Sequence, residues 1–148
     1  MVARLFPELI DELRVDVVSD DLPAPSFNVA PTDQAAIVLD SAKTDPPTRR
    51  LAPARWGLVP SWAKDPSGGA RAINARAETV FDKPTFATAI AKRRATVPVS
   101  GYYEWRAGVD GKTPFFIHPP ADAPLLLRAC TNGGGIRRRP RTTRPGGC

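Results

Sequence analysis

Proline is the residue that most limits what this chain can fold into. Seventeen of the 148 residues are proline, spread from Pro7 to Pro145. Because proline lacks a backbone N–H and clashes with the preceding helical turn, long helices are disfavoured and short strands joined by turns are favoured. A chain of this length with 42% hydrophobic residues buries one modest core, so we expect one strand-rich, mainly antiparallel domain of the α+β class.

Hydrophobic spacing predicts where the elements lie. Apolar residues recur at helical intervals over residues 1–14, and a second short helix is expected over 83–94. Strands are expected over 34–39, 95–107, 112–118 and 123–129, with extended structure over 49–63 and a hairpin turn at 108–111. Residues 17–33 are expected to form a loop, and residues 64–69 a flexible loop of the kind that often borders a site.

The net charge of +6 comes from the C-terminal end of the chain. From Arg128 onward there are six arginines and no acid, whereas residues 1–127 hold 15 basic and 15 acidic groups. Within that body, residues 49–106 carry eleven basic and four acidic side chains. This middle part is suited to facing phosphate, although an unevenly charged, solvated surface is the simpler interpretation of charge alone.

Several kinds of active site lack the residues that they need. Both cysteines, Cys130 and Cys148, lie near the C-terminal end, and His118 is the single histidine. A disulfide framework, a CxxC metal site and a histidine-based triad are therefore excluded for residues 1–127, and we expect His118 to be a surface or packing residue. No apolar run reaches membrane length and no secretory pattern opens the chain, which favours a cytoplasmic protein.

Two stretches carry polar groups in unusual places. "AINARAETVFD", residues 72–82, sets Asn74, Arg76 and Glu78 at alternate positions, and an extended backbone would direct Asn74 and Arg76 to the same side. In "GYYEW", Glu104 is expected among aromatic rings, where burial and a neighbouring arginine would tune its pKa for proton exchange. The alternative for Glu104 is a carboxylate on the solvent side of a half-buried strand.

Tryptophans suited to base stacking lie in the motif that precedes the predicted loop 64–69. Trp56 stands inside an apolar run, so a core position is favoured for it. Trp62 stands beside the glycine-containing loop and is the better candidate for stacking on a nucleic-acid base.

Five motifs in a fixed order make the chain resemble a known family. They are "SFNVAPT", "RWGLVPSWA", "INARAET", "VPVSGYYEW" and "KTPFFI", and they fall within residues 26–127. In this order they resemble the SOS response-associated peptidase (SRAP) family, the abasic-site processing proteins. The resemblance implies a barrel-like α+β fold and a monomeric, nucleoid-associated DNA-repair protein of the SOS response. Its partner would be single-stranded DNA with abasic sites, without metal, nucleotide cofactor or membrane.

The resemblance also implies the chemistry. In the family, a cysteine after the initiator methionine becomes the N-terminus by self-processing, and its amine and thiol capture the abasic sugar as a Schiff base and then a thiazolidine. Glu104 matches the acid/base glutamate and Asn74 matches the asparagine that orients the reacting groups. The residues assigned to DNA contact are Pro31, Trp62, Arg76 and Trp105.

Both ends depart from the family pattern. The family begins Met-Cys-Gly-Arg, whereas the second residue here is Val2. Either "MVAR" lies over that motif with the cysteine replaced, or Met1 is internal to a longer protein and residues 1–14 are the helix that follows the family's first strand. Helical spacing favours the second interpretation, which makes Arg4 a helix-surface residue and not the family's DNA-binding arginine.

The C-terminal end loses the family pattern after Leu127. Synonymous codons for residues 127–137, translated in a shifted frame, give Ala-Gly-Leu-Tyr-Glu-Trp-Trp-Arg-Asp-Pro, which resembles the family's next strand. We therefore expect a frame change near Leu127, a partial domain over 1–127 and an aberrant low-complexity tail over 128–148. The alternative for the tail is a disordered arm that binds nucleic acid.

Two functions follow. The first is the family enzyme, a cysteine-type peptidase (hydrolase) and lyase that forms a DNA–protein crosslink at abasic sites. The second is a non-catalytic fragment that binds single-stranded DNA, and it is favoured for this polypeptide because valine stands at position 2 and residues 1–127 contain no thiol. A general thiol protease is disfavoured, since residues 1–127 contain no Cys/His pair.

Overall fold

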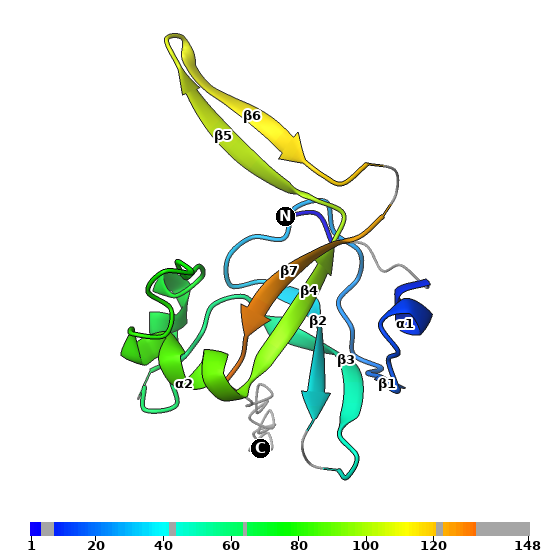
Figure 1. The fold of residues 1–148 in the computed structure, drawn as a ribbon. Coiled ribbons are helices and arrows are strands. Elements are labelled where there is room, and N and C mark those ends of the chain that lie inside the picture. The colour runs from blue at the N-terminus through cyan, green and yellow to red at the C-terminus, as the bar shows by residue number, and fades with distance from the viewer. Residues whose placement is uncertain (4–7, 42–43, 64, 121–122, 133–148) are drawn as a thin grey trace, which may run out of the picture.

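The computed structural model describes residues 1–3, 8–41, 44–63, 65–120 and 123–132. Their elements in chain order are α1 (Glu8–Glu12), β1 (Val17–Val18), β2 (Gln34–Ser41), β3 (Thr48–Arg55), the 3-10 helix η1 (Pro66–Arg71), α2 (Pro84–Lys92), β4 (Arg94–Val99), β5 (Tyr102–Gly108), β6 (Gly111–Ile117) and β7 (Leu125–Cys130). Figure 1 shows a central sheet between α1 and α2, with a long hairpin that projects away from it.

The larger sheet has five strands in the order β1-β3-β2-β4-β7. The short β1 runs parallel to β3, and the other neighbours are antiparallel. β2 pairs with β3 over its whole length, from Gln34↔Arg55 to Ser41↔Thr48. β4 pairs with β7 from Arg94↔Cys130 to Val99↔Leu125, so the strand expected over 123–129 continues to Cys130.

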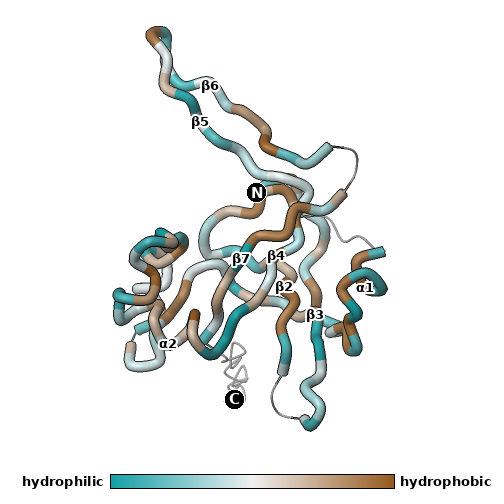
Figure 2. Tube along the Cα trace, viewed as in Figure 1, coloured by the Kyte–Doolittle hydropathy of each residue, from teal (hydrophilic) through white to brown (hydrophobic). Residues whose placement is uncertain are grey.

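The core lies on both faces of β2. Four consecutive residues, Ala35 to Val38, are buried, as expected for a strand that is covered on two sides. Ala36 and Val38 pack with Leu51 beneath the N-terminal segment, which contributes Leu13, Val15 and Leu22. A second cluster joins Leu58 to Phe86 and Ala89 of α2. In Figure 2, which colours the trace by hydropathy, hydrophobic and hydrophilic segments follow one another along the chain.

The hairpin of β5 and β6 forms a separate two-stranded sheet. Its strands pair from Tyr102↔Ile117 to Gly108↔Gly111, so Val109 and Asp110 form the turn and confirm the hairpin predicted at 108–111. Every residue from 103 to 118 is exposed. The single strand predicted over 95–107 is wrong: it is broken at Ser100–Gly101. Gly101 lies so close to β6 that a Cβ there would approach the Ile117 carbonyl oxygen to 2.5 Å.

The predicted helix over residues 1–14 is wrong at its beginning. Val2 donates to the Gly101 carbonyl (2.8 Å) and accepts from the Ser100 N–H (2.9 Å), while Ala3 exchanges two 2.8 Å bonds with Ser26. These strand-like bonds pair the backbone N–H and C=O groups of Val2 and Ala3, and Val2 is buried. This pairing and burial stabilise the extended conformation more than the apolar spacing favours a helix. Within the described residues α1 covers Glu8–Glu12, and residues 4–7, including Arg4, lie outside the described part.

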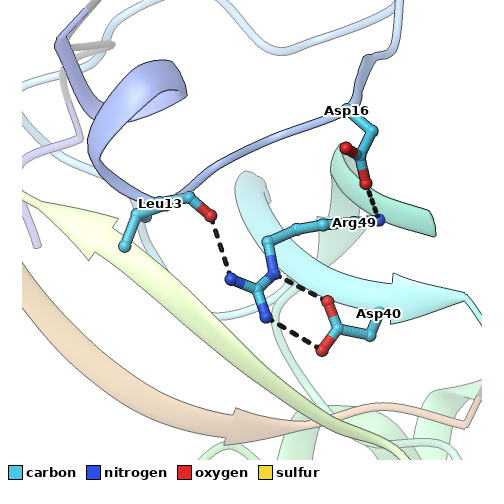
Figure 3. A network of polar contacts seen from close by, with 4 residues as sticks. All are labelled: Leu13, Asp16, Asp40 and Arg49. Carbon is cyan, nitrogen blue, oxygen red and sulfur yellow. Dashed lines mark hydrogen bonds and ion pairs between the residues drawn. The ribbon is translucent and has the colours of Figure 1, made fainter. Parts of the chain in front are cut away.

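A polar network ties the N-terminal segment to the sheet (Figure 3). The Arg49 guanidinium of β3 donates to both carboxylate oxygens of Asp40 in β2, at 2.7 and 3.1 Å, and to the Leu13 carbonyl at 3.0 Å. The Arg49 backbone N–H donates to the Asp16 carboxylate at 2.7 Å. Because the bidentate bond favours the ionised form, Arg49 lowers the pKa of Asp40.

The α+β class and the mainly antiparallel pairing are confirmed, and α2 confirms the helix expected over 83–94. The described strands form an open five-stranded sheet and a hairpin, and do not close into the barrel that the family resemblance implied. None of the described helices is long and apolar enough to cross a membrane.

Candidate nucleic-acid interface

The segment that carries Asn74 and Arg76 is held through its carbonyl groups. The Trp56 indole Nε1–H donates to the Ile73 carbonyl at 2.7 Å, and the Leu58 backbone N–H donates to the Ala72 carbonyl at 3.0 Å. These bonds fix the chain immediately before Asn74. Residues 74–76 belong to neither sheet, so strand alternation does not set their directions, and a common side for Asn74 and Arg76 stays a prediction.

The polar side chains of this segment are not used in folding. Asn74, Arg76 and Glu78 are all exposed, and within the described part of the chain their side chains form no hydrogen bond or ion pair. A short turn follows, in which the Thr79 N–H donates to the Arg76 carbonyl at 3.2 Å. An amide and a guanidinium in this state keep all their donors for a ligand.

Two glycines, Gly57 and Gly69, allow their backbone segments to approach each other closely. Gly57 has a φ of +127°, and a Cβ there would lie 2.5 Å from the Gly69 carbonyl oxygen. Close approach of two backbone segments therefore requires glycine at this position. The loop predicted over 64–69 forms the start of η1, whose N-cap, Asp65, accepts bonds from the backbone and hydroxyl of Ser67. The Ser67 hydroxyl is the main cause of the lowered pKa of Asp65.

Pro31 lies on an exposed turn next to the end of β3. The turn is closed by the Asp33 N–H, which donates to the Ala30 carbonyl at 3.1 Å, and by the Ala30 N–H, which donates to the Asp33 carboxylate at 2.9 Å. Thr32 has a φ of +78°, which is strained for a β-branched residue. Its N–H donates to the Trp56 carbonyl at 2.9 Å, so Trp56 contacts both this turn and the segment of Asn74.

Exposed aromatic side chains lie near these segments along the sequence. Trp62 is 69% exposed on a turn closed by the Ala63 N–H and the Pro60 carbonyl, which leaves its rings free to stack. Phe27 and Phe81, at 77% and 67% exposed, were missed by the sequence reasoning. The available signal was their position, since Phe27 lies inside "SFNVAPT" and Phe81 follows "INARAET" closely.

Glu104 and Trp105 lie on β5. Glu104 is opposite Phe115 and Trp105 is opposite Pro114, so consecutive residues point to opposite faces of the hairpin. The expectation that Glu104 sits buried among aromatic rings is wrong in this structure, because the side chain is exposed. No hydrogen bond or ion pair among the described residues links β5 to Asn74 or Arg76.

The remaining candidate groups do not form a reactive centre. His118 is exposed and stacks on Phe116 with ring centroids 5.2 Å apart, which confirms a surface residue. Cys130 lies half-buried at the end of β7, and burial raises the pKa of its thiol. The described residues contain no group of three or more His, Cys, Asp or Glu that is able to hold a metal ion.

The fold and this surface define an α+β domain that presents an amide, a guanidinium and several aromatic rings to solvent. The chain belongs to the SRAP family, since the model of the SOS response associated peptidase matches residues 3–133. The recognition based on five ordered motifs is thereby confirmed. The match extends past Leu127 and covers the end of β7.

Relatives at the sequence level are abasic site processing proteins. YoaM of Bacillus subtilis (strain 168) is 38% identical over 109 residues, which are 73% of this chain and 46% of YoaM. The Mus musculus protein HMCES is 36% identical over 106 residues, which are 65% of this chain and 30% of HMCES. The chain therefore spans less than half the length of these two relatives.

Solved structures share the fold. A crystal structure of a Bordetella bronchiseptica protein superposes with a TM-score of 0.65 and 25% identity, covering 87% of this chain and 61% of that one. A Bacteroides thetaiotaomicron protein gives a TM-score of 0.55 and 28% identity, covering 67% and 41%.

Proposed function

We propose that this chain is the single-stranded-DNA-facing part of an abasic-site processing protein. The observation that carries the proposal is the pair of Asn74 and Arg76, whose side chains are exposed and unpaired within the described chain although their segment is fixed at two carbonyls. In this role Arg76 binds a phosphate and Asn74 orients the abasic sugar. Pro31 and Trp62 pack against unstacked bases on either side of the site.

In the complete reaction, Glu104 exchanges protons while an N-terminal amine attacks the abasic aldehyde. The amine loses a proton and forms a Schiff base with loss of water, and a neighbouring thiol then adds to the carbon of that imine. Trp105 extends the DNA surface along β5. We further propose that this reaction supplies the lyase and self-processing peptidase activities of a monomeric, cytoplasmic, nucleoid-associated protein in the SOS response.

The polypeptide as printed binds without crosslinking. Val2 stands after Met1, and its backbone pairs with Gly101, three residues before Glu104. This position supports the alignment of "MVAR" with the family's opening motif, with valine at the place of the nucleophilic cysteine. Among the described residues the only thiol is Cys130, which is half-buried and has a raised pKa, so Cys130 supplies little thiolate. These facts favour a non-catalytic single-stranded DNA-binding chain.

The test is a map of the DNA-binding residues. The ¹⁵N-labelled chain is titrated with a short single strand that carries one tetrahydrofuran abasic analogue, and amide shifts are followed. The proposal predicts that shifts concentrate at residues 30–33, 60–63 and 73–79, and then at 104–105. Shifts confined to the arginine-rich residues 137–144 would contradict it, because they would indicate non-specific binding of phosphate.

A further inference from the structure

We propose that Trp56 is a positioning residue that holds the turn of Pro31 and the segment of Asn74 in one fixed arrangement, and this inference rests on the proposed function. Three hydrogen bonds carry it. The Trp56 backbone N–H donates to the Asp33 carbonyl at 2.8 Å and its carbonyl accepts from the Thr32 N–H at 2.9 Å. Its indole Nε1–H donates to the Ile73 carbonyl at 2.7 Å.

The indole bond acts directly on Asn74. The carbonyl of Ile73 and the N–H of Asn74 belong to the same planar peptide group, so fixing the Ile73 oxygen fixes the plane from which Asn74 begins. Leu58 fixes the preceding peptide group through the Ala72 carbonyl. With both planes held, the direction of the Asn74 side chain is set by its own φ and its rotamers.

The backbone bonds of Trp56 act on the other segment. They extend the β2–β3 ladder beyond Gln34↔Arg55 and hold Thr32 at its positive φ of 78°. A strained residue keeps this conformation only where neighbouring bonds enforce it. Trp56 thus contacts the Pro31 turn through its backbone and the Asn74 segment through its side chain, so it links the two segments that the proposed DNA strand touches.

This role differs from the core position predicted for Trp56. A core tryptophan acts through apolar contact, which phenylalanine largely reproduces. A positioning tryptophan acts through its N–H, which phenylalanine lacks. Trp56 is only half-buried, and it donates a short bond to a carbonyl seventeen residues away. Trp62 provides the comparison within the same chain, because it is 69% exposed and its indole has no partner among the described residues.

The first measurement needs no DNA. Hydrogen exchange of the two indole N–H groups is followed by NMR in the full chain. The positioning role predicts that the Trp56 N–H exchanges at least tenfold more slowly than that of Trp62, because only the former is hydrogen-bonded. Equal exchange rates would overturn the proposal, whatever the chain binds.

The second measurement is a double-mutant cycle on affinity for the single strand with a tetrahydrofuran abasic analogue. Trp56→Phe is expected to weaken binding about three- to tenfold, in line with the loss of one hydrogen bond. In the Asn74→Ala background the same substitution is expected to change affinity less than twofold, because its effect passes through Asn74. An equal effect in both backgrounds would overturn the positioning role.

A core substitution separates positioning from general destabilisation. Ile37→Val shortens a side chain that is 5% exposed in β2 and lowers stability, but it is expected to leave DNA affinity unchanged well below the melting temperature. A loss of affinity in Ile37→Val as large as in Trp56→Phe would overturn the proposal. If the wild-type chain binds no single strand, the proposed function fails, and the indole exchange still decides whether Trp56 fixes the segment.

Discussion

Arg76 offers the most quantitative test of a DNA-facing surface. Its side chain is exposed and has no ion pair among the described residues, so Arg76→Ala removes no contact that stabilises the fold. Surface substitutions of this kind change the free energy of unfolding by about 0.5 kcal/mol or less. Any larger effect on DNA binding therefore comes from the lost charge and not from misfolding.

The magnitude follows from counterion release. Each phosphate contact with single-stranded DNA contributes about 0.7 to the slope of log affinity against log salt concentration. Loss of one contact therefore makes the slope shallower by about 0.7. When salt rises fourfold, from about 50 to about 200 mM, the affinity of the wild type should therefore fall by a factor about 2.6 times larger than the factor by which the affinity of the variant falls.

Fluorescence anisotropy of a labelled single strand at several salt concentrations measures this slope. Arg94→Ala is the matched control, because Arg94 is exposed on β4, opposite Cys130, and lies in no segment assigned to DNA. The arginines of residues 137–144 are present in all three proteins, so their contribution cancels in the comparison. An unchanged slope in Arg76→Ala, or the same change in Arg94→Ala, would refute a specific phosphate contact at Arg76.

Three further predictions concern the fold and the chemistry. Because Arg49 lowers the pKa of Asp40, the pair stabilises the fold above the unfolded pKa of about 3.9 and loses this contribution as pH falls through the folded pKa. Acid unfolding curves should show that Asp40→Asn removes this pH-dependent contribution. The loss in free energy of unfolding should be less than about 1 kcal/mol, since both side chains are substantially exposed. Gly57→Ala should lower stability by about 2 kcal/mol in denaturant melts, whereas Gly68→Ala, with open space at its Cβ, should not. Incubated with abasic single-stranded DNA, this chain should give no heat-stable adduct on a denaturing gel, and a stable adduct at any residue would contradict the proposal that it binds without crosslinking.

Local signals predicted the elements that depend on neighbours in the sequence. Proline near its start and apolar spacing located α2, and the Gly-Val-Asp-Gly stretch located the hairpin turn. The apolar run of β2 was equally clear. Each of these elements is specified by residues within a few positions of one another.

The errors occur where distant backbone pairing decides. Residues 1–3 have a helical pattern, yet Val2 pairs with a segment about one hundred residues away, and no local signal encodes that partner. Pro7 also disfavours a continuous helix that begins at residue 1. The parallel pairing of β1 with β3 is non-local in the same way.

The candidate site shows the same division. Motifs identified Asn74, Arg76 and Trp62, and the structure leaves all three exposed. The part played by Trp56 was not predictable from its apolar surroundings, because a hydrogen bond to Ile73 depends on the close approach of the backbone at Gly57 to that at Gly69. The sequence left two positions open for Glu104, and the structure has the solvent-exposed one, since an aromatic sequence predicts burial only when another element covers the strand.

The central claim is that this chain recognises an abasic site in single-stranded DNA. It is tested most directly by competition, in which a labelled abasic-analogue strand is displaced by the unlabelled intact strand or by the unlabelled abasic strand of the same sequence. Charge contacts of the arginine-rich residues contribute nearly equally to both competitors. We predict that the abasic strand competes several-fold better and that Asn74→Ala removes this preference. Equal competition by the two strands would contradict the claim.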